Sequence, residues 1–352
     1  MTLYQREECG KGMTDGIAIL LKLLRAGLYG ESVTLERVPS EKEWEQAFDL
    51  AISQSVVALT GEGLSSLSQD VLPSKELLLQ WIGLTIQQKQ TFDIQRKLTL
   101  ELIKMWEDAG ISCIELKGNS IGRLYHVPEA RYSCDFDCLL SDYEKGNEVV
   151  ELHGIEVNRD FYKNSSFNWK GLYVENHQFC TPIRGNKAMK QFERRLRGLL
   201  AESDEYPCAD FNALFLMEHA WAHFFENALT LKQLCDWAVF RKACGGEVDW
   251  KLFEREAKAC GFWHFSESMN RLADLLDGNR KEEELEEDDK RLLKDMLDEH
   301  SIQMNNGWRT RIQLVRNYFS QSWKYRVFSN HSMPYTLCRT ALGFVFDRNP
   351  RI

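Results

Sequence analysis

Apolar residues recur every three or four positions over two long parts of the chain, and this spacing predicts amphipathic helices. The clearest stretch runs from Ser74 to Gly110, where the pattern favours one amphipathic helix or a pair of them, ended by Gly110. Helices are also expected at 15–26, 40–57, 211–229 and 231–244, and a further one beginning at Asp249. The N-terminal part of the chain and the part after about Gly185 should therefore be helical.

Between these helical parts, apolar and polar positions alternate, as in β-strands with one buried face. The expected elements are strands at 111–116, 132–140 and 171–179, a turn at 117–120, and helices at 121–125 and near 142–152. The sequence thus predicts an α+β fold, with a small mixed β-sheet flanked by N- and C-terminal helical regions. We expect a helical region at 1–108, a small α/β core at 109–185, and a second helical region with a basic aromatic tail at 186–352.

Two aspartates separated by one residue lie in the second expected strand. Side chains at i and i+2 of a strand point to the same face, so Asp135 and Asp137 should project together while Phe136 enters the core. Adjacent carboxylates repel each other, and a hard divalent cation such as Mg²⁺ relieves this repulsion because it takes oxygen ligands. Taken alone, the pair is also typical of a solvated strand edge, because the chain has 53 acidic residues.

Residues on either side of this pair suit phosphate chemistry. Upstream, a strand ends in Lys117-Gly118 and a helix follows. Glycine allows close backbone approach, while the lysine and the N–H groups of a helix start attract phosphate. Downstream, Glu175 lies in the third expected strand, from which it could present a third carboxylate. This order of elements suits two-metal phosphoryl transfer, in which the cations bridge triphosphate oxygens and activate a hydroxyl.

The segments that contain these residues resemble a bacterial family of uncharacterised nucleotidyltransferases, within the DNA polymerase β-like nucleotidyltransferase superfamily. The family pattern has a strand closing in Leu-Lys-Gly, an Arg ahead of an Asp-x-Asp strand, and an acid and a histidine two residues apart. Later it has a helix with two histidines and a Cys-Asp pair. The corresponding segments here are Cys113–Tyr125, Arg131–Leu140, Glu175 with His177, His219 with His223, and Leu234–Trp237. The resemblance extends over roughly residues 75–255.

This resemblance implies a nucleoside triphosphate, ATP or another, bound together with Mg²⁺. It makes Asp135, Asp137 and Glu175 both metal ligands and catalytic residues, and Glu175 a candidate for the base that orients the attacking hydroxyl. The residues expected to bind the nucleotide are Lys117, Gly118, Asn119, Ser120, Arg131 and His177.

The sequence departs from the superfamily pattern at two of these positions. Asn119 follows the glycine where Ser or Gly is usual, and Glu175 stands where Asp is common. Asn119 can still hydrogen-bond a phosphate. The departures are compatible with a member that binds nucleotide but turns it over slowly.

Other histidines allow more than one interpretation. His219 and His223 lie four residues apart, so both rings should share one helix face. Since no glutamate stands between them as in zinc peptidase motifs, packing or hydrogen bonding near the sheet is favoured over a zinc site. His177 could contact phosphate or base, or make a structural hydrogen bond.

The C-terminal tail combines cations with aromatic side chains. The last 52 residues hold eight Lys or Arg and one acid, Asp347. The aromatic residues are Trp308, Tyr318, Phe319, Trp323, Tyr325 and Phe328. Such a tail could contact nucleic acid or membrane, but packing of its helix onto the acidic body is favoured.

Composition narrows the function classes further. Hydrophobic residues make up 43% and charged residues 28% of the 352 positions, as in globular proteins. The net charge of −9 speaks against binding to nucleic acid or to an anionic membrane. No apolar run reaches the length of a membrane span, and Met1–Lys11 lacks the apolar segment of a secretory signal. The ten cysteines form no CxxC pair, which indicates reduced thiols and a cytoplasmic protein.

Together these features predict a Mg²⁺-dependent nucleotidyltransferase. It would transfer a nucleoside monophosphate from a nucleoside triphosphate to the hydroxyl of an unidentified acceptor and release pyrophosphate. One alternative is a catalytically weak or inactive module on the same fold that binds nucleotide or a partner. Another is a metal-dependent glycosyltransferase, which also uses Asp-x-Asp, but the helix-rich N-terminal part lacks the βαβ series that such enzymes need.

Overall fold

A computed structural model describes residues 15–201, 206–226, 228–298, 320–347 and 350–351. The N-terminal stretch Met1–Lys11 and the tail residues Trp308, Tyr318 and Phe319 lie outside these ranges.

Within residues 15–108, four α-helices form the N-terminal part. They are α1 (Asp15–Tyr29), α2 (Glu41–Ser53), α3 (Val57–Leu64) and α4 (Lys75–Asp108). Ser40 starts α2 with a capping box, in which Glu43 accepts hydrogen bonds from the Ser40 backbone N–H at 2.6 Å and from its hydroxyl at 2.8 Å. The stretch for which one helix or two were expected is the single helix α4, and Gly110 follows it with φ +74°.

Among the described residues, the strands form one four-stranded sheet in the order β1-β2-β4-β3. Its strands are β1 (Cys113–Glu115), β2 (Asp135–Leu140), β3 (Asn164–Trp169) and β4 (Leu172–His177). The β2–β4 pair is parallel, and the β1–β2 and β3–β4 pairs are antiparallel, so the sheet is mixed as predicted. The alternation of apolar and polar positions did not predict β3, because four of its six residues are Asn or Ser. Its inward positions Phe167 and Trp169 are buried against the core.

Two short helices lie beside the sheet. The first, α5 (Gly118–Gly122), begins directly at the glycine, three residues earlier than expected. The second, α6 (Tyr143–Leu152), begins where the sequence indicated, with Asp142 as its N-cap.

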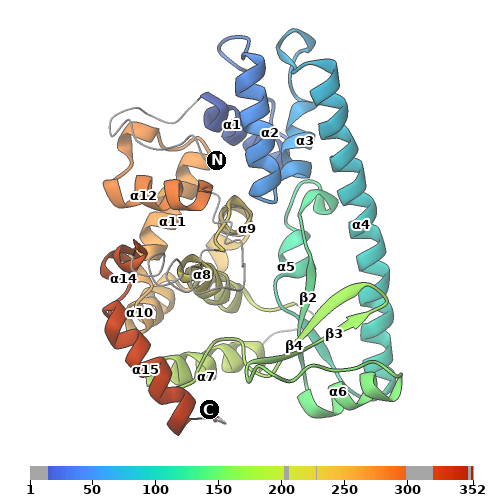
Figure 1. The fold of residues 1–352 in the computed structure, drawn as a ribbon, viewed down its shortest axis with the longest axis vertical. Helices are drawn as coiled ribbons and strands as arrows, with labels where there is room; N and C mark the ends of the chain where they lie inside the picture. Colours follow the sequence, from blue (N-terminus) through green and yellow to red (C-terminus); the bar gives the residue numbers. More distant parts are fainter. Residues whose placement is uncertain (1–14, 202–205, 227, 299–319, 348–349, 352) are drawn as a thin grey trace, which may run out of the picture.

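One face of the sheet is apolar and packs on α4 and α6. Phe136, Cys138 and Leu140 of β2 belong to a buried cluster with Leu102 and Trp106 of α4. Phe136 is only 3% exposed, as the alternation predicted. Figure 1 shows α4 running along one side of the molecule, with the sheet beside its C-terminal half. The opposite face of β2 therefore carries its aspartates away from this core.

The C-terminal part is helical. Its elements are α7 (Lys187–Ala201), α8 (Ala209–Phe225), α9 (Leu231–Cys244), α10 (Trp250–Cys260), α11 (Trp263–Leu276), α12 (Glu287–Leu297), α14 (Ser322–Phe328) and α15 (Met333–Phe346). Single turns of 3₁₀-helix occur at Gln69–Val71, Pro128–Ala130, Gly245–Glu247 and Glu282–Glu284. Buried residues of α7–α12, α14 and α1–α3 belong to one hydrophobic cluster, separate from the cluster under the sheet. The division of the chain at 108/109 and 185/186 remains a prediction.

The described part of the tail packs on the body. Trp323 and Phe328 are buried, and the Trp221 indole donates a hydrogen bond of 2.7 Å to the Phe328 carbonyl. Lys324 donates to the Phe224 carbonyl at 2.8 Å and lies 2.6 Å from an Asp295 oxygen. Within the described residues, no helix has both the length and the apolar character needed to cross a membrane.

Candidate active site

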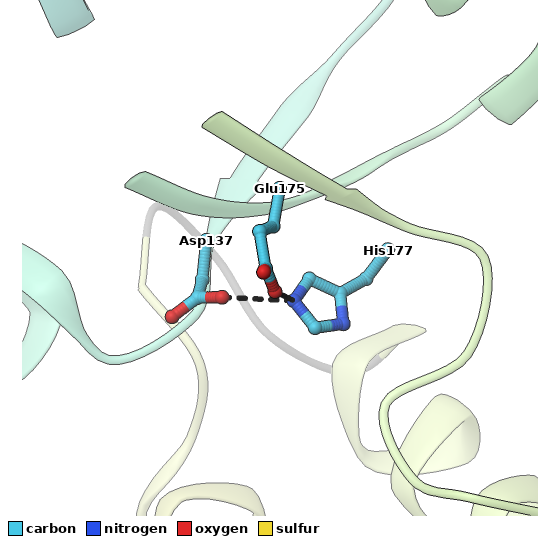
Figure 2. A group of neighbouring side chains, drawn as sticks. All are labelled: Asp137, Glu175 and His177. Atoms are coloured by element: carbon cyan, nitrogen blue, oxygen red, sulfur yellow. Dashed lines mark hydrogen bonds and ion pairs between the residues drawn. The ribbon is translucent and has the colours of Figure 1, made fainter. Parts of the chain in front are cut away.

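The parallel pairing of β2 with β4 brings acidic side chains onto one face of the sheet. Asp137 is directly opposite Glu175, and Asp135 is opposite Tyr173. His177 lies two residues beyond Glu175 and therefore shares its face. Figure 2 shows the three side chains converging: one ligand atom each from Asp137, Glu175 and His177 lies within 4.8 Å of the others.

Asp137 is the most constrained member of this cluster. It is 6% exposed; its Oδ1 lies 2.8 Å from His177 Nε2 and its Oδ2 lies 2.6 Å from Lys117 Nζ. Burial alone would raise the pKa of Asp137, but the Lys117 ammonium and the His177 hydrogen bond outweigh it and hold the pKa well below its usual range. Asp137 is therefore ionised at neutral pH. Lys117 stays charged too. Burial lowers its pKa, but the charges of Asp137 and Asp135 outweigh burial and raise the pKa above its usual value.

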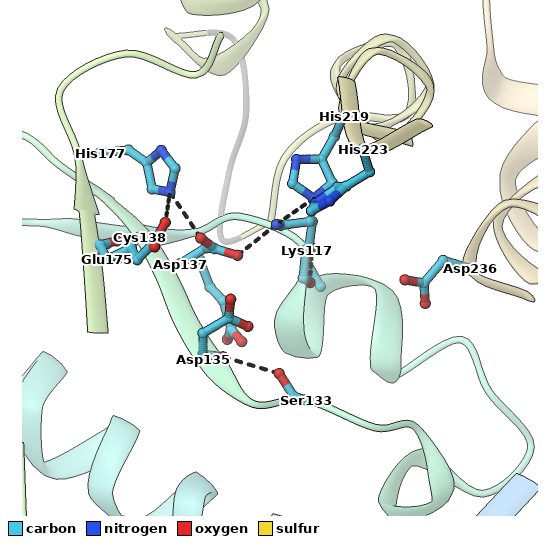
Figure 3. Close-up of polar contacts among 12 residues, drawn as sticks. Lys117, Ser133, Asp135, Asp137, Cys138, Glu175, His177, His219, His223 and Asp236 are labelled. Carbon is cyan, nitrogen blue, oxygen red and sulfur yellow. Dashed lines mark hydrogen bonds and ion pairs between the residues drawn. The ribbon is translucent and has the colours of Figure 1, made fainter. Parts of the chain in front are cut away.

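Asp135 lies two residues before Asp137 on β2, outside this cluster. Its carboxylate lines the same cavity, but it is not one of the three groups that converge within 4.8 Å. Figure 3 shows it on the same strand as Asp137. The predicted trio of acids thus shares one face, but the third member of the converging group is His177, which had been expected to bind nucleotide.

The Lys-Gly turn has a geometry set by Glu115. Lys117 has φ +69°, unusual for a residue with a side chain, and Gly118 has φ +25°. A methyl group at Gly118 would overlap Glu115 Oε1. The Glu115 carboxylate accepts a 2.6 Å hydrogen bond from the Asn119 backbone N–H and longer ones from the Asn119 side-chain amide. Ser120 is buried and donates to the Lys117 carbonyl at 2.6 Å. The described contacts of Asn119 and Ser120 therefore hold the turn itself, and their binding of nucleotide remains a prediction.

Arg131 is also engaged within the protein. It is 4% exposed, and its Nε and one terminal nitrogen donate to the two Asp236 oxygens at 2.7 and 2.9 Å. The Tyr125 hydroxyl donates to the same carboxylate at 2.7 Å. Burial would raise the pKa of Asp236, but Arg131 lowers it to below its usual value. This bidentate pair joins the segment before β2 to α9, and Asp236 is the aspartate of the Cys-Asp pair noted in the sequence.

The two histidines of α8 meet the lysine of the turn. His219 Nε2 lies 3.0 Å from Lys117 Nζ and 2.8 Å from His223 Nε2, and Figure 3 shows both rings beside Lys117. Burial, and then the Lys117 charge, lower the pKa of His219 well below its usual value and that of His223 to about 4. Both rings are therefore neutral at pH 7. Hydrogen bonding near the sheet was the favoured interpretation, and the structure adds that these rings line the cavity.

A cavity of about 590 Å³ brings many of these groups together. Its lining includes Lys117, Asp135, Asp137, Glu175, His177, His219, His223 and Asp236, but not Arg131, Gly118, Asn119 or Ser120. Five charged residues in its wall were not identified from the sequence, namely Asp160, Lys163, Glu218, Glu226 and Lys232. No motif marks them, since each is a single charged residue in an otherwise ordinary segment. The only sequence signal for Glu218 is its position next to His219, on the helix already noted for its two histidines.

The donor set of the cluster fits a divalent cation. Two carboxylates and one imidazole are a common combination for transition metals, while Mg²⁺ prefers oxygen alone. The His177 Nδ1 faces the Phe179 carbonyl at 3.3 Å, and this contact directs Nε2 toward the carboxylates. In metal-binding histidines, the ring nitrogen that does not bind the metal is commonly held by a hydrogen bond in the same way. Asp137, Glu175 and His177 can therefore hold a cation, with Asp135 close by on the same strand.

Fold and site together describe an α+β protein with a mixed four-stranded sheet and a buried candidate metal centre on one sheet face. A family model described as uncharacterised nucleotidyltransferase matches residues 40–277, about two thirds of the chain. The protein belongs to this family. The matched range includes the whole sheet, α8 and α9. Searches of curated proteins and of solved structures gave no match.

Proposed function

We propose that this protein transfers a nucleoside monophosphate from a nucleoside triphosphate to the hydroxyl of an acceptor, releasing pyrophosphate. The observation that carries the proposal is the Asp137–Glu175–His177 cluster, which lies beside a buried lysine in a cavity large enough for a nucleotide. Membership of the nucleotidyltransferase family supports the same reaction class.

The chain's own residues have distinct tasks in this proposal. Asp137 and Glu175, assisted by Asp135, would hold the cation, and Lys117 would leave Asp137 to bind the triphosphate. With Mg²⁺ bound, His177 would keep Asp137 oriented through its 2.8 Å contact; with Mn²⁺, its imidazole would be a further ligand. A bound divalent cation would neutralise the triphosphate and polarise its α-phosphate.

The remaining predicted residues fit supporting tasks. Gly118, Asn119 and Ser120 shape the turn that presents Lys117, and Arg131 anchors the segment that leads into β2. They would act on the nucleotide through the position of Lys117 and of the strand.

We propose Mg²⁺ as the cation, because it accompanies nucleoside triphosphates and because three carboxylates face the cavity. The imidazole of His177 favours Mn²⁺ as a competitor. The two ions are therefore compared in the experiment below.

A specific observation favours the alternative of a nucleotide-binding protein without turnover. In the structure the Asp137 carboxylate is already neutralised by Lys117, and the turn is closed by Glu115. If these contacts persist with nucleotide bound, the cation lacks a ligand and transfer does not follow.

We also place the protein in the cytoplasm and expect no nucleic-acid partner. All cysteines among the described residues are free thiols, and the acidic net charge repels nucleic acid.

The test is calorimetry with ATP, GTP, CTP and UTP in Mg²⁺ or Mn²⁺, followed by measurement of pyrophosphate release. Glu175→Gln removes one cluster carboxylate but keeps the Lys117–Asp137 pair, so the fold should persist. We expect metal-dependent nucleotide binding to weaken at least about tenfold in this variant. Glu148→Gln, an exposed position on α6, is the matched control and should bind as the wild type does.

Nucleotide binding that is equal in Glu175→Gln and wild type would contradict the site. Tight binding without pyrophosphate release would favour the non-catalytic alternative.

A further inference from the structure

Helix α8 forms a second wall of the cavity, separated from the carboxylates by Lys117. Lys117 Nζ is 2.6 Å from Asp137 and 3.0 Å from His219 Nε2, so this wall begins one side chain away from the candidate metal centre (Figure 3). Neither the family resemblance nor the cluster of acids assigns a task to the α8 wall.

Glu218 is the unusual residue of this wall. It is 2% exposed, yet it lines the cavity, and its Oε1 has no hydrogen-bond partner among the described residues. A buried carboxyl oxygen without a partner costs free energy, so proteins retain one chiefly where a ligand or a reaction uses it. The orphan oxygen therefore indicates a binding or catalytic task.

The surroundings of Glu218 set its proton affinity. Burial raises its pKa to about 7; Lys163 and Lys117 lower it, while Glu193 of α7 and Glu226 of α8 raise it. A group with a pKa near the working pH is best suited to accept and release a proton. Glu175, by contrast, lies 3.5 Å from His177 within the cation cluster, where a carboxylate is needed as a ligand.

We propose that Glu218 is the general base that deprotonates the acceptor hydroxyl. The acceptor is an uncharged molecule that carries this hydroxyl and binds along α8. This inference rests on the transfer reaction proposed above. The acceptor oxygen forms a bond to the α-phosphorus, and the bond from that phosphorus to the bridging oxygen of the β-phosphate breaks. Pyrophosphate leaves with that electron pair, and the hydroxyl proton passes to Glu218.

The charge state of the wall supports an uncharged acceptor. His219 and His223 are neutral at pH 7, because burial and Lys117 depress the pKa of each ring. The remaining lining includes two further acids, Asp160 and Glu226, and two further lysines, Lys163 and Lys232, whose charges balance. Amides and hydroxyls complete it, namely Ser55, Asn158, Asn164, Ser166, Thr230 and Gln233. Such groups hydrogen-bond hydroxyls without demanding a charge.

The test measures pyrophosphate release from ATP with Mg²⁺, in water alone and with glycerol, choline or glycerate added. Each of the three additives offers a primary hydroxyl, on a neutral, a cationic and an anionic molecule. We expect glycerol to accelerate release and to give a nucleotidyl-glycerol detectable by mass spectrometry, with choline and glycerate less effective. Release that is no faster with glycerol than in water, or faster with a charged additive, overturns the acceptor class.

Glu218→Gln tests the base. The variant should bind a non-hydrolysable ATP analogue as the wild type does, and its release of pyrophosphate should fall about 100-fold. The wild-type rate should rise with pH through about 7, where Glu218 ionises, and the residual rate of the variant should not. Glu148→Gln is the matched control on the protein surface.

The failures can be told apart. If wild type and Glu218→Gln release pyrophosphate equally, Glu218 is not the base and the transferase proposal stands. If the wild type binds nucleotide but releases no pyrophosphate, even with water as acceptor, the transferase proposal fails and this inference with it.

Discussion

Lys117 Nζ lies 2.6 Å from Asp137 Oδ2, and both side chains are largely buried, at 13% and 6% exposure. An internal cation thus occupies the carboxylate that a metal ion would need. Breaking a buried pair leaves an uncompensated charge, which costs much more than a surface pair does. Lys117 and a divalent cation should therefore compete for Asp137.

Replacing Lys117 with Met tests this competition. Without added metal, the variant should lose about 3–5 kcal/mol of stability, because the buried Asp137 loses its ammonium partner and keeps only the His177 contact. Millimolar Mn²⁺ should then raise the melting temperature of the variant more than that of the wild type. Thermal unfolding with Mn²⁺ and with EDTA measures both effects, and the exposed Lys104→Gln is the control. An equal rise in both proteins would show that Lys117 and the metal do not share Asp137.

The Arg131–Asp236 pair should be a stability element. Asp236→Asn leaves Arg131 buried without its anionic partner, so we expect a loss of about 3–5 kcal/mol. The double variant Arg131→Met/Asp236→Leu removes both charges and should recover part of this loss. Urea unfolding gives the three free energies. Single and double variants of equal stability would mean that the pair is not coupled in the folded state.

Comparing Gly118→Ala with Gly154→Ala separates the cost of a steric collision from the cost of a positive φ. A Cβ at Gly118 collides with Glu115, whereas one at Gly154, which also has positive φ (+77°), meets no neighbour within 4 Å. Gly154→Ala should cost about 1 kcal/mol through its backbone alone. Gly118→Ala should cost more and weaken nucleotide binding, because the turn that presents Lys117 must shift. Chemical unfolding and calorimetry on both variants check this expectation, and equal costs would contradict the role assigned to Glu115.

Glu218 should make the protein less stable as the pH rises. Its pKa is about 7 in the folded state and near the ordinary glutamate value of 4.5 when unfolded, so the folded state holds the proton more tightly. The stabilisation from this proton is complete below about pH 4.5 and is lost as the pH rises through about 7. Glu218→Gln should therefore raise stability relative to wild type at pH 8, by up to about 3 kcal/mol, and much less at pH 5. Unfolding free energies at both pH values measure this. A Glu218→Gln variant that is no more stable than wild type at pH 8 would show that the carboxyl is not desolvated as described.

Local pattern alone was sufficient for much of the fold. The apolar spacing of 75–108 predicts helix there, though not whether it is one helix or two. Alternation places Phe136 in the core, while Asp135 and Asp137 share the other face. These are properties of one helix or one strand, whose periods of 3.6 and 2 residues can be read without knowing any partner. The resemblance to the nucleotidyltransferase family likewise depended on short segments, and the family match confirms it.

Only the tertiary structure decided which of these residues meet. Strand β3 is polar in sequence and becomes a strand because β4 supplies its hydrogen-bond partners. Arg131 finds Asp236 105 positions away, and Lys117 finds both Asp137 and His219. Such contacts depend on strand register and helix packing, which short-range periodicity does not encode. For the same physical reason a single sequence offered no sign that Glu218 would be buried without a partner in the wall of the cavity.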